Sequence, residues 1–360
     1  MRLKKALFLG TLCTAVSGMS LFAQAGVSYA KSAKETTEAS SEEAAETESE
    51  KETSEEVTYP IVIEHAFGET VIESKPERIA TVGWGNQDTP LALGIAPVGV
   101  SAANYGLVTD HQLHLWTDEA FADLGVEEPV VFDDVDGLDF EQISDCNPDV
   151  ILAAYSGMTQ EDYETLSQIA PVIPYKENPW QTSWREQTIE NAEGMGMKAE
   201  GEKKVKEVEE LIAEKLEEYP QLEGIPTAFC WISADDLSTF YVYLPTDPRA
   251  AYLLDLGFTL PESVEKLAGE SNDFSITVSR ENADQLDDIE MMVVYGDENL
   301  VETLQKDKLM SQIPAIKNGA VVVLDSTSAL AASSTPSILS IPYEIDEYLE
   351  MFAKAAENIK

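Results

Sequence analysis

The chain has 360 residues, of which 67 are acidic and 23 are basic, and its formal net charge at pH 7 is −44. A negative field of this size disfavours binding to nucleic acid or to an anionic lipid surface. About 300 residues remain beyond the N-terminal segments described below, which is more than one hydrophobic core usually serves, so we expect two lobes.

The first 30 residues have the pattern of a secretory signal peptide. A basic start at residues 2–5 precedes an apolar run, and small residues allow cleavage after Ala25 or Ala30. Glycine and serine interrupt the run too often for a permanent membrane span. Cys13 follows a leucine where a lipid-modification site needs a small residue, so anchoring to the envelope stays open. We expect an exported protein, in the periplasm or at the cell surface.

Residues 31–56 form an acidic segment of a different kind. They include ten Glu, three Lys and no aromatic or β-branched apolar residue. Such a segment cannot bury enough apolar surface to offset the entropy lost on ordering. The sequence therefore predicts a disordered, self-repelling tether.

Short apolar runs alternate with helical stretches along the rest of the chain. Residues 59–74 alternate around Gly68 and Glu69, which predicts a hairpin. Strand-like runs follow at residues 78–83, 96–102, 149–155, 171–175, 227–233, 238–244, 290–296 and 320–325. Runs of this length between helices indicate parallel strands covered on both faces. We therefore predict an α/β fold with two Rossmann-like lobes of mostly parallel sheet.

One long helix is expected to join these lobes. Its apolar side chains recur three or four residues apart, at Val205, Val208, Ile212, Leu216 and Tyr219. Pro220 should end the helix. We place the interlobe helix at 199–220, between an N-terminal lobe at 57–198 and a C-terminal lobe at 221–360. An ordinary surface helix is the alternative.

The sequence offers little for catalysis or metal binding. No serine-hydrolase elbow, phosphate-binding loop or zinc-protease motif occurs. His111 and His114 lie three residues apart without a third His or Cys nearby, which favours a solvated turn over a metal site. Cys146 and Cys230 lie in apolar segments of different halves, so we expect buried free thiols. We predict no catalytic residue, no metal site and no intrinsic cofactor.

Ligands in open parallel sheets bind beyond the carboxyl ends of the strands. Aromatic and amide side chains at or near these ends are the candidate binding residues: Trp84, Asn104, Tyr105, Tyr155, Trp180, Trp231 and Tyr295. Aromatic rings would stack against a chelate with an apolar periphery. Burial in the core is the alternative for each ring.

The connection at residues 178–187 contains two Trp and one Arg after a proline, which indicates a binding surface. Packing under the long helix is the alternative for Trp184. Arginine is scarce in this chain, and Arg185 and Arg249 are the candidates for pairing with an anionic or carbonyl-bearing ligand.

Four blocks of the sequence resemble the iron–siderophore binding proteins of bacterial ABC importers. The first, at 60–100, enters a strand with Lys-Pro-x-Arg-Ile and closes on Leu-Gly-x-x-Pro-Val-Gly. The others are 139–157, 178–187 and 333–355. The blocks are distributed from residue 60 to residue 355, over most of the chain beyond the tether.

This resemblance implies two lobes bridged by one long helix, with limited closure around a ferric chelate. It also implies delivery of the chelate to a membrane permease that an ATPase drives. Docking through lobe-tip carboxylates would use Glu161 on the first lobe. On the second lobe the family position falls near Ala251, which carries no carboxylate, and Asp247 is the substitute candidate.

Our hypothesis is that a monomer holds an Fe(III)–siderophore complex between its lobes. Trp84, Tyr105 and Trp180 would stack on the chelate, and Arg185 and Arg249 would polarise it, with the iron held by the chelator. The scarcity of arginine and the negative field favour a neutral hydroxamate over an anionic catecholate.

Other ligands and functions remain open from the sequence. Haem or a corrinoid could occupy the same cleft. The scaffold could also serve an exported chelate-processing enzyme, such as a reductase or hydrolase, or a surface interaction module with an empty cleft.

Overall fold

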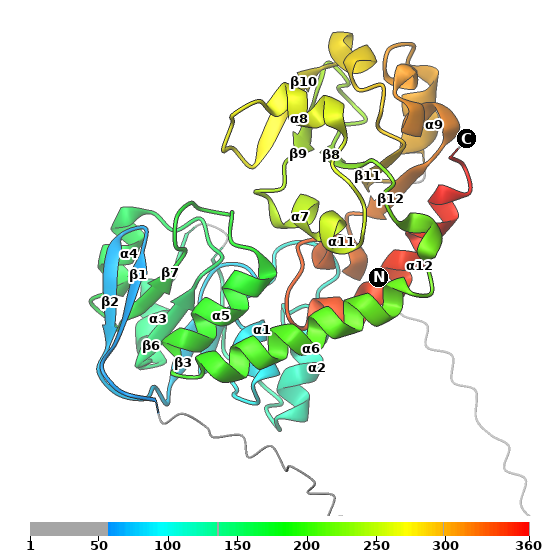
Figure 1. Cartoon of the computed structure of the whole chain (residues 1–360). Helices are drawn as coiled ribbons and strands as arrows, with labels where there is room; N and C mark the ends of the chain where they lie inside the picture. The colour runs from blue at the N-terminus through cyan, green and yellow to red at the C-terminus, as the bar shows by residue number, and fades with distance from the viewer. Residues whose placement is uncertain (1–56, 135–136, 298, 360) are drawn as a thin grey trace, which may run out of the picture. The chain divides into compact units, whose positions relative to one another are not determined.

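The structure is a computed structural model, and it describes residues 57–134, 137–297 and 299–359 (Figure 1). The predicted signal peptide, the acidic tether and Cys13 lie outside these residues. Within the described part of the chain, no helix is both long and apolar enough to cross a membrane.

The first sheet is five-stranded and entirely parallel. In spatial order its strands are β5 (Val131–Phe132), β4 (Gly99–Ser101), β3 (Ile79–Thr81), β6 (Val150–Ala153) and β7 (Val172–Pro174). The chain moves outward from β3 to one edge and then from β6 to the other edge. The strand order therefore reverses between β3 and β6, which is the topological switch point of the sheet.

Both faces of this sheet are buried. Along β6, Val150 and Leu152 belong to one apolar cluster, and Ile151 and Ala153 belong to another. Alternate side chains of a strand point to opposite faces, so a strand covered on both sides is apolar throughout. The covering helices are α1 (Asp88–Ala92), α2 (Leu115–Asp123), α3 (Phe140–Asp145), α4 (Gln160–Leu166) and α5 (Trp184–Gly194).

A two-stranded hairpin precedes the sheet, as predicted, with β1 (Ile61–His65) antiparallel to β2 (Gly68–Ile72). The predicted position of its turn is wrong by two residues. The turn lies at Ala66 and Phe67, and Gly68 opens β2 with a φ of 127°. This backbone conformation favours glycine, and the glycine therefore marks the start of the strand here.

The second sheet is mixed. Its spatial order is β10 (Ser275–Ser279), β9 (Thr239–Tyr243), β8 (Thr227–Trp231), β11 (Met291–Gly296) and β12 (Val321–Asp325). Strands β8, β11 and β12 are parallel to one another, whereas β9 and β10 run antiparallel. The sequence pattern does not reveal β5 or β10, because β5 has two residues and β10 has only two apolar ones. The predicted fold class, with two α/β lobes of mostly parallel sheet, is confirmed.

The helices after the first lobe are α7 (Pro248–Asp255), α8 (Glu262–Ala268), α9 (Leu300–Lys306), α10 (Pro314–Asn318), α11 (Ala329–Ser333) and α12 (Ser340–Ala356). Short 3₁₀ helices lie at Pro220–Leu222, Arg280–Gln285 and Met310–Gln312. Cys230 is a buried free thiol, as predicted, whereas Cys146 is free but only partly buried.

The long helix is α6 (Lys198–Leu216), about 28 Å in length. It ends before Pro220, which instead opens a short 3₁₀ helix. A residue that precedes proline is steered away from helical backbone, and Tyr219 has φ −126° and ψ 50°. The prediction that the helix reaches Pro220 is therefore wrong by one turn.

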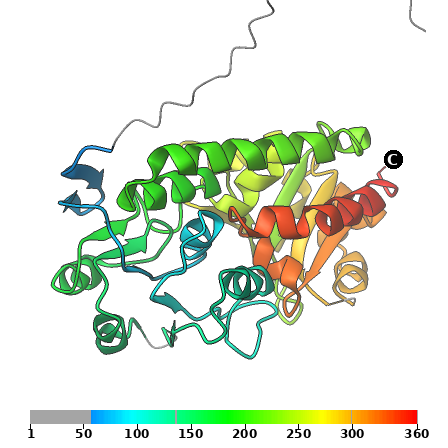
Figure 2. The same cartoon turned by 90° about the horizontal axis from the view of Figure 1, so that it is seen from below.

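The predicted apolar face of α6 is buried at Val205, Val208 and Ile212. These side chains belong to a core cluster that also contains residues of the second sheet, of α12 and of α5. Helices α6 and α12 contact each other and lie side by side (Figure 2). Trp184 belongs to the same cluster and is 2 % exposed, so the alternative that it packs under the long helix is confirmed.

A second attachment between the lobes follows α11. The Ser337 hydroxyl donates a hydrogen bond to the Asp88 carboxylate of the first lobe. Leu339 packs against apolar clusters of both lobes. The ring centroids of Trp116 and Tyr343 are 6.1 Å apart. Ser337, Leu339 and the first turn of α12 therefore contact the first lobe, and α12 also contacts α6.

Asp88 is a buried acid at this attachment. Its carboxylate accepts hydrogen bonds from Trp116 Nε1 and Thr117 Oγ1, both at 2.9 Å, and from Ser337. Burial raises the pKa of Asp88 to about 6, although the three hydrogen bonds lower it.

This pKa predicts a pH-dependent contribution to stability. As pH rises from about 4 to about 6, the unfolded chain releases the Asp88 proton before the folded chain does. The folded state therefore loses on the order of 3 kcal/mol of stability relative to a chain without this acid. We expect the unfolding free energy of wild type, minus that of Asp88→Asn, to fall over this interval and then to level off. Urea unfolding of both proteins at pH 4, 5, 6 and 7 measures this difference in unfolding free energy.

Asp145→Asn is the matched control, because Asp145 is an exposed acid on α3. Its difference from wild type should not follow the same curve. A pH-independent difference for Asp88→Asn would contradict the expectation.

Candidate functional site

A cavity of about 410 Å³ lies between residues of the two lobes. Seven of the predicted binding residues line it: Trp84, Tyr105, Tyr155, Trp180, Trp231, Arg249 and Tyr295. The remaining lining residues are Tyr243, Asp247, Phe274 and Thr335. We call this the interlobe cavity.

The first-lobe wall is held by Asn86, which is fully buried behind it. Its Nδ2 donates to the carbonyls of Val82 and Tyr155, at 2.7 and 2.9 Å, and its Oδ1 accepts from Tyr155 N at 3.1 Å. Trp84 N donates to Tyr155 O at 3.2 Å. At Gly83, with φ 82°, a Cβ would lie 2.8 Å from Tyr155 O, so only glycine allows this approach. The loops that carry Trp84 and Tyr155 are therefore fixed to each other.

Trp180 is held in an unusual conformation with its ring exposed. Its φ is 61°, in the left-handed region that non-glycine residues rarely adopt. Its backbone N–H donates to Ser156 O at 3.1 Å, and its ring meets Tyr155 edge-on at 5.3 Å between centroids. A Cβ at Gly157 would lie 2.4 Å from the indole Nε1, so the indole lies directly against this glycine. The indole is thus positioned by the backbone, although the residue is 41 % exposed.

The second-lobe wall contains the phenol rings of Tyr243 and Tyr295. Tyr105 of the first lobe meets Tyr295 edge-on at 5.5 Å, and the Tyr295 hydroxyl lies 2.7 Å from Ser334 Oγ. Burial raises the pKa of Tyr243 to about 12 and raises the pKa values of Tyr105 and Tyr295 as well. These phenols are therefore neutral at physiological pH.

Arg249 and Asp247 form a bidentate ion pair in this wall. Arg249 Nε and Nη2 donate to Asp247 Oδ1 and Oδ2 at 2.8 and 2.6 Å. The guanidinium carbon lies 3.8 Å from the Tyr243 ring centroid. The only basic residue of the described lining is thus paired with a carboxylate, and the pair adds no net charge to the cavity.

The predicted docking role of Asp247 is wrong. This residue is 1 % exposed, so its carboxylate cannot reach a membrane partner. It caps α7 instead, because its Oδ1 accepts from Arg249 N at 2.9 Å. Burying a carboxylate is unfavourable unless it is paired and hydrogen-bonded, and Arg249 supplies the pairing.

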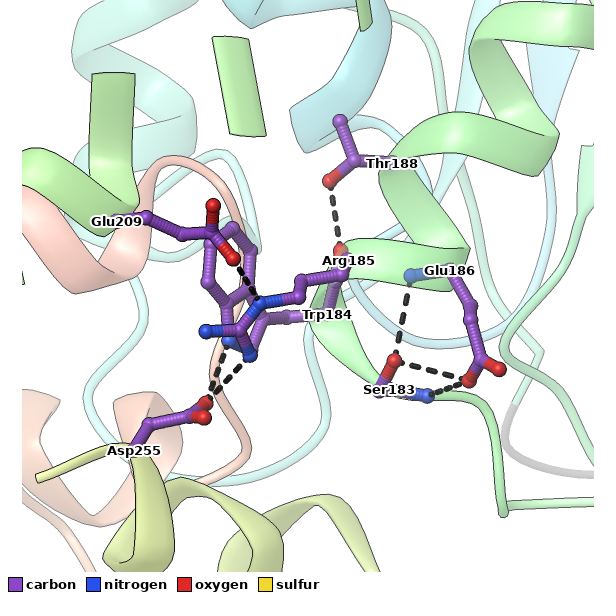
Figure 3. A network of polar contacts seen from close by, with 7 residues as sticks. All are labelled: Ser183, Trp184, Arg185, Glu186, Thr188, Glu209 and Asp255. Atoms are coloured by element: carbon purple, nitrogen blue, oxygen red, sulfur yellow. Dashed lines mark hydrogen bonds and ion pairs between the residues drawn. The ribbon is translucent and has the colours of Figure 1, made fainter. Parts of the chain in front are cut away.

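The structure also contradicts the predicted ligand role of Arg185, which does not line the interlobe cavity. Figure 3 shows its polar contacts instead. Its Nε donates to Glu209 of α6 at 2.6 Å, and its Nη1 donates to Asp255 of α7 at 2.7 Å. Trp184 Nε1 donates to the same Asp255 oxygen at 3.0 Å. Two acids satisfy the guanidinium, and Arg185 therefore joins α5 to α6 and α7.

His114 lies behind the interlobe cavity and is buried. The solvated turn that the sequence favours for it is therefore wrong. Its ring stacks on Trp116 at 4.7 Å and lies 5.1 Å from Trp84, and its Nε2 is 3.1 Å from Tyr105 O. Burial lowers the pKa of His114 to about 4, so the ring is neutral. His111 pairs with Asp118 at 2.7 Å. Among the described residues, no group of three His, Cys, Asp or Glu could hold a metal ion.

Asn104 and Glu161 lie elsewhere. Asn104 lines a separate cavity of the first lobe. Glu161 is exposed in the first turn of α4, which begins with a reciprocal capping box between Thr159 and Asp162. A rigid helix start therefore presents this carboxylate to solvent.

Phe274 and Tyr243 are cavity residues that the sequence does not identify. Phe274 precedes β10, and its ring stacks on Tyr243 at 6.5 Å. Ser275, the next residue, pairs with Tyr243 across the β9–β10 ladder. This contact depends on the antiparallel pairing of β9 with β10. The sequence does not reveal that pairing, because β10 has too few apolar residues to be recognised as a strand.

Removal of the Arg185 side chain should weaken the attachment between the lobes. Arg185→Ala loses two charge-assisted hydrogen bonds, but the guanidinium is partly exposed, so we expect a loss of about 1 kcal/mol in unfolding free energy. Lys206→Ala is the control, because its pair with Glu210 is highly exposed and 3.8 Å long. Chemical denaturation of both variants measures the difference, and equal effects would contradict an interlobe role for Arg185.

Known proteins of similar sequence include a protein family and siderophore-binding relatives. The model of a family described as periplasmic binding protein matches residues 79–327. The petrobactin-binding protein YclQ of Bacillus subtilis is 24 % identical over 306 residues, which cover 81 % of this chain and 88 % of YclQ. The ferric-anguibactin-binding protein FatB of Vibrio anguillarum is 24 % identical over 309 residues, covering 81 % of this chain and 87 % of FatB.

One solved structure has a higher sequence identity to this chain than these two relatives. Streptococcus pneumoniae PiaA in complex with ferrichrome is 47 % identical, with a TM-score of 0.80, and the match covers 83 % of this chain and all of PiaA. Staphylococcus aureus SirA complexed with staphyloferrin B is 22 % identical with a TM-score of 0.62, covering 83 % of this chain and 99 % of SirA, and it supports the fold alone.

Proposed function

This chain belongs to the periplasmic binding protein family, and we propose that it captures a ferric siderophore outside the cytoplasm for an ABC importer. A membrane permease, driven by an ATPase, would then receive the chelate. The observation that carries this proposal is the interlobe cavity, walled by aromatic rings from both lobes and without net charge. The family consists of solute-binding proteins, and we propose that this chain likewise performs no covalent chemistry.

The exposed rings of the cavity suit the periphery of a chelate. Trp180 on the first lobe faces the same cavity as Trp231 and Phe274 of the second lobe, and all three are about two-fifths exposed. The volume of 410 Å³ is within the range of about 300–1,000 Å³ typical of small-molecule sites. Contact with these rings would bury apolar area and fix the orientation of the chelate.

The charge of the wall favours a neutral chelate. An anionic catecholate complex would lose its hydration on entry. Arg249 would compensate little, because its Nε and Nη2 already donate to Asp247. The core of a ferric trihydroxamate has no net charge and offers carbonyl oxygens to the phenol hydroxyls. The complex of the 47 % identical PiaA with ferrichrome supports this class of ligand.

In this proposal the iron is held by the chelator alone. The described lining of the interlobe cavity contains no His, Cys or Met. Neutral phenols are poor ligands for a ferric ion, because the phenolate is the coordinating form, and the pKa of Tyr243 is about 12. The same lining gives no support to haem or a corrinoid with a His or Met axial ligand.

Delivery would occur as a monomer in the periplasm or at the cell surface. Glu161 is our candidate for contact with the permease, because it is exposed at the start of α4.

Binding is tested by tryptophan fluorescence quenching with ferrichrome and with its gallium(III) counterpart. We expect saturable one-to-one binding, with equal affinity for both metals, because the protein contacts only the chelator. Trp180→Ala should weaken binding about tenfold, as the loss of a stacked ring predicts. Lys206→Ala, far from the cavity lining, is the control. Absence of binding by any ferric chelate, or turnover of the chelate, would overturn the proposal.

The paired charge predicts a specificity change in Asp247→Asn. The substitution leaves Arg249 uncompensated, whereas asparagine still caps α7. We expect the affinity for an anionic ferric tricatecholate, relative to ferrichrome, to rise about tenfold. Asp255→Asn removes a carboxylate outside the cavity and should leave this ratio unchanged. An unchanged ratio in Asp247→Asn would show that the ion pair does not set ligand charge.

A further inference from the structure

A second cavity, of about 320 Å³, opens at the switch point of the first sheet. Gly83 and Trp84 of its wall follow β3, Ser156 follows β6, and Ser101 ends β4. Ligands of open α/β sheets bind in the crevice where the strand order reverses, beyond the carboxyl ends of the strands. We call this the switch-point cavity.

The switch-point cavity adjoins the interlobe cavity. Trp84 and Trp180 line both. The backbone N–H of Trp84 donates to the same Tyr155 carbonyl that Asn86 contacts, and the Trp180 indole lies against Gly157. A ligand in the interlobe cavity could therefore extend past these two rings into the first lobe.

The two cavities differ in charge. In the interlobe cavity, Asp247 is neutralised by Arg249. The described lining of the switch-point cavity contains two acids, Asp134 and Asp162, and no basic residue. Asp162 is occupied by the capping box of α4, since its carboxylate accepts from Thr159 N and Oγ1.

Asp134 is the acid whose carboxylate can accept a further hydrogen bond. Its Oδ2 accepts a hydrogen bond from the Ser101 hydroxyl, and the Ser101 oxygen in turn accepts from Gly83 N at 3.1 Å. Its Oδ1 is buried and has no hydrogen-bond partner among the described residues. Burial raises the pKa of Asp134, although the Ser101 hydroxyl and the backbone N–H of Asp139 lower it. A buried acceptor of this kind is stabilised by a charged donor from a ligand.

We propose that the switch-point cavity is a subsite for a cationic arm of the ferric chelate, a protonated primary amine on a short apolar chain, with Asp134 as its acceptor. The ammonium group donates to the free Asp134 oxygen. Leu138 and Met158 line the same cavity and contact the methylene groups of the arm. The neutral ferric core stays between the lobes. This inference rests on the proposed siderophore-binding function and specifies its ligand further.

The test compares three ligands on the full chain by fluorescence quenching. They are a linear ferric trihydroxamate that ends in a primary amine, its N-acetylated counterpart, and ferrichrome. We expect the amine form to bind about tenfold more tightly than the acetylated form, as one charge-assisted hydrogen bond predicts. Asp134→Asn should abolish this preference and leave the affinities for the acetylated form and for ferrichrome unchanged.

Asp133→Asn is the matched control, because it removes the same charge from an exposed neighbour. It should preserve the preference for the amine. Equal wild-type affinity for the amine and acetylated forms overturns the subsite without any variant, and so does a preference that survives Asp134→Asn. In both cases binding of ferrichrome would leave the receptor function standing. Failure of all three ligands to bind would remove both proposals.

Discussion

The burial of the apolar face of α6 in a core shared by both lobes is the constraint on which the rest of the structure depends. Val205, Val208 and Ile212 lie in one cluster with Trp184 of the first lobe, with the second sheet and with α12. Separation of the lobes would expose this cluster to water, at about 25 cal/mol for each Å² of apolar surface. The hydrogen bonds of Trp184 and Arg185 to Asp255 fix the direction of the contact, which apolar packing alone does not.

This constraint explains why the interlobe cavity has defined walls. Each wall is tied together, since Asn86 joins two loops of the first lobe and Arg249 at the start of α7 lies over the Tyr243 ring of β9. The shared core then holds the two walls opposite each other. We expect these attachments to keep the cavity walls in place, so that little ordering entropy opposes binding. The resemblance to the family implies limited closure of the lobes, which the same shared core would favour.

The sequence predicts those parts of the fold and site that depend on local pattern. Parallel strands place their carboxyl ends at one edge, so Trp84, Tyr155 and Tyr295 could be assigned to a common cavity without coordinates. The buried face of α6 follows in the same way from the spacing of its apolar residues. Strand β10 and its neighbour Phe274 could not be found, because too few of the strand's residues are apolar.

The two wrong site assignments have a common physical cause. Arg185 and Asp247 were assigned by residue type, whereas their roles depend on partners. The acids that bind Arg185 lie 24 and 70 residues away along the chain, and a chain with 67 acidic residues gives no sign of which ones will be close. For Asp247 the partner is two residues away, but the sequence does not show that this turn is buried. Charge pairing is a property of tertiary structure here.

The neutral phenols of the interlobe cavity bear on how an importer receptor releases its cargo. A ferric ion prefers anionic oxygen ligands, and a phenolate beside the chelate would compete with the chelator for the metal. Burial raises the pKa of Tyr243 to about 12 and those of Tyr105 and Tyr295 in the same direction, so these side chains offer hydroxyl donors and no coordinating anion. In the proposed function, donors of this kind would bind the chelator's carbonyl oxygens without withdrawing its iron. The chelate would then leave intact, as transfer to a permease requires, and the chelator alone would select for iron.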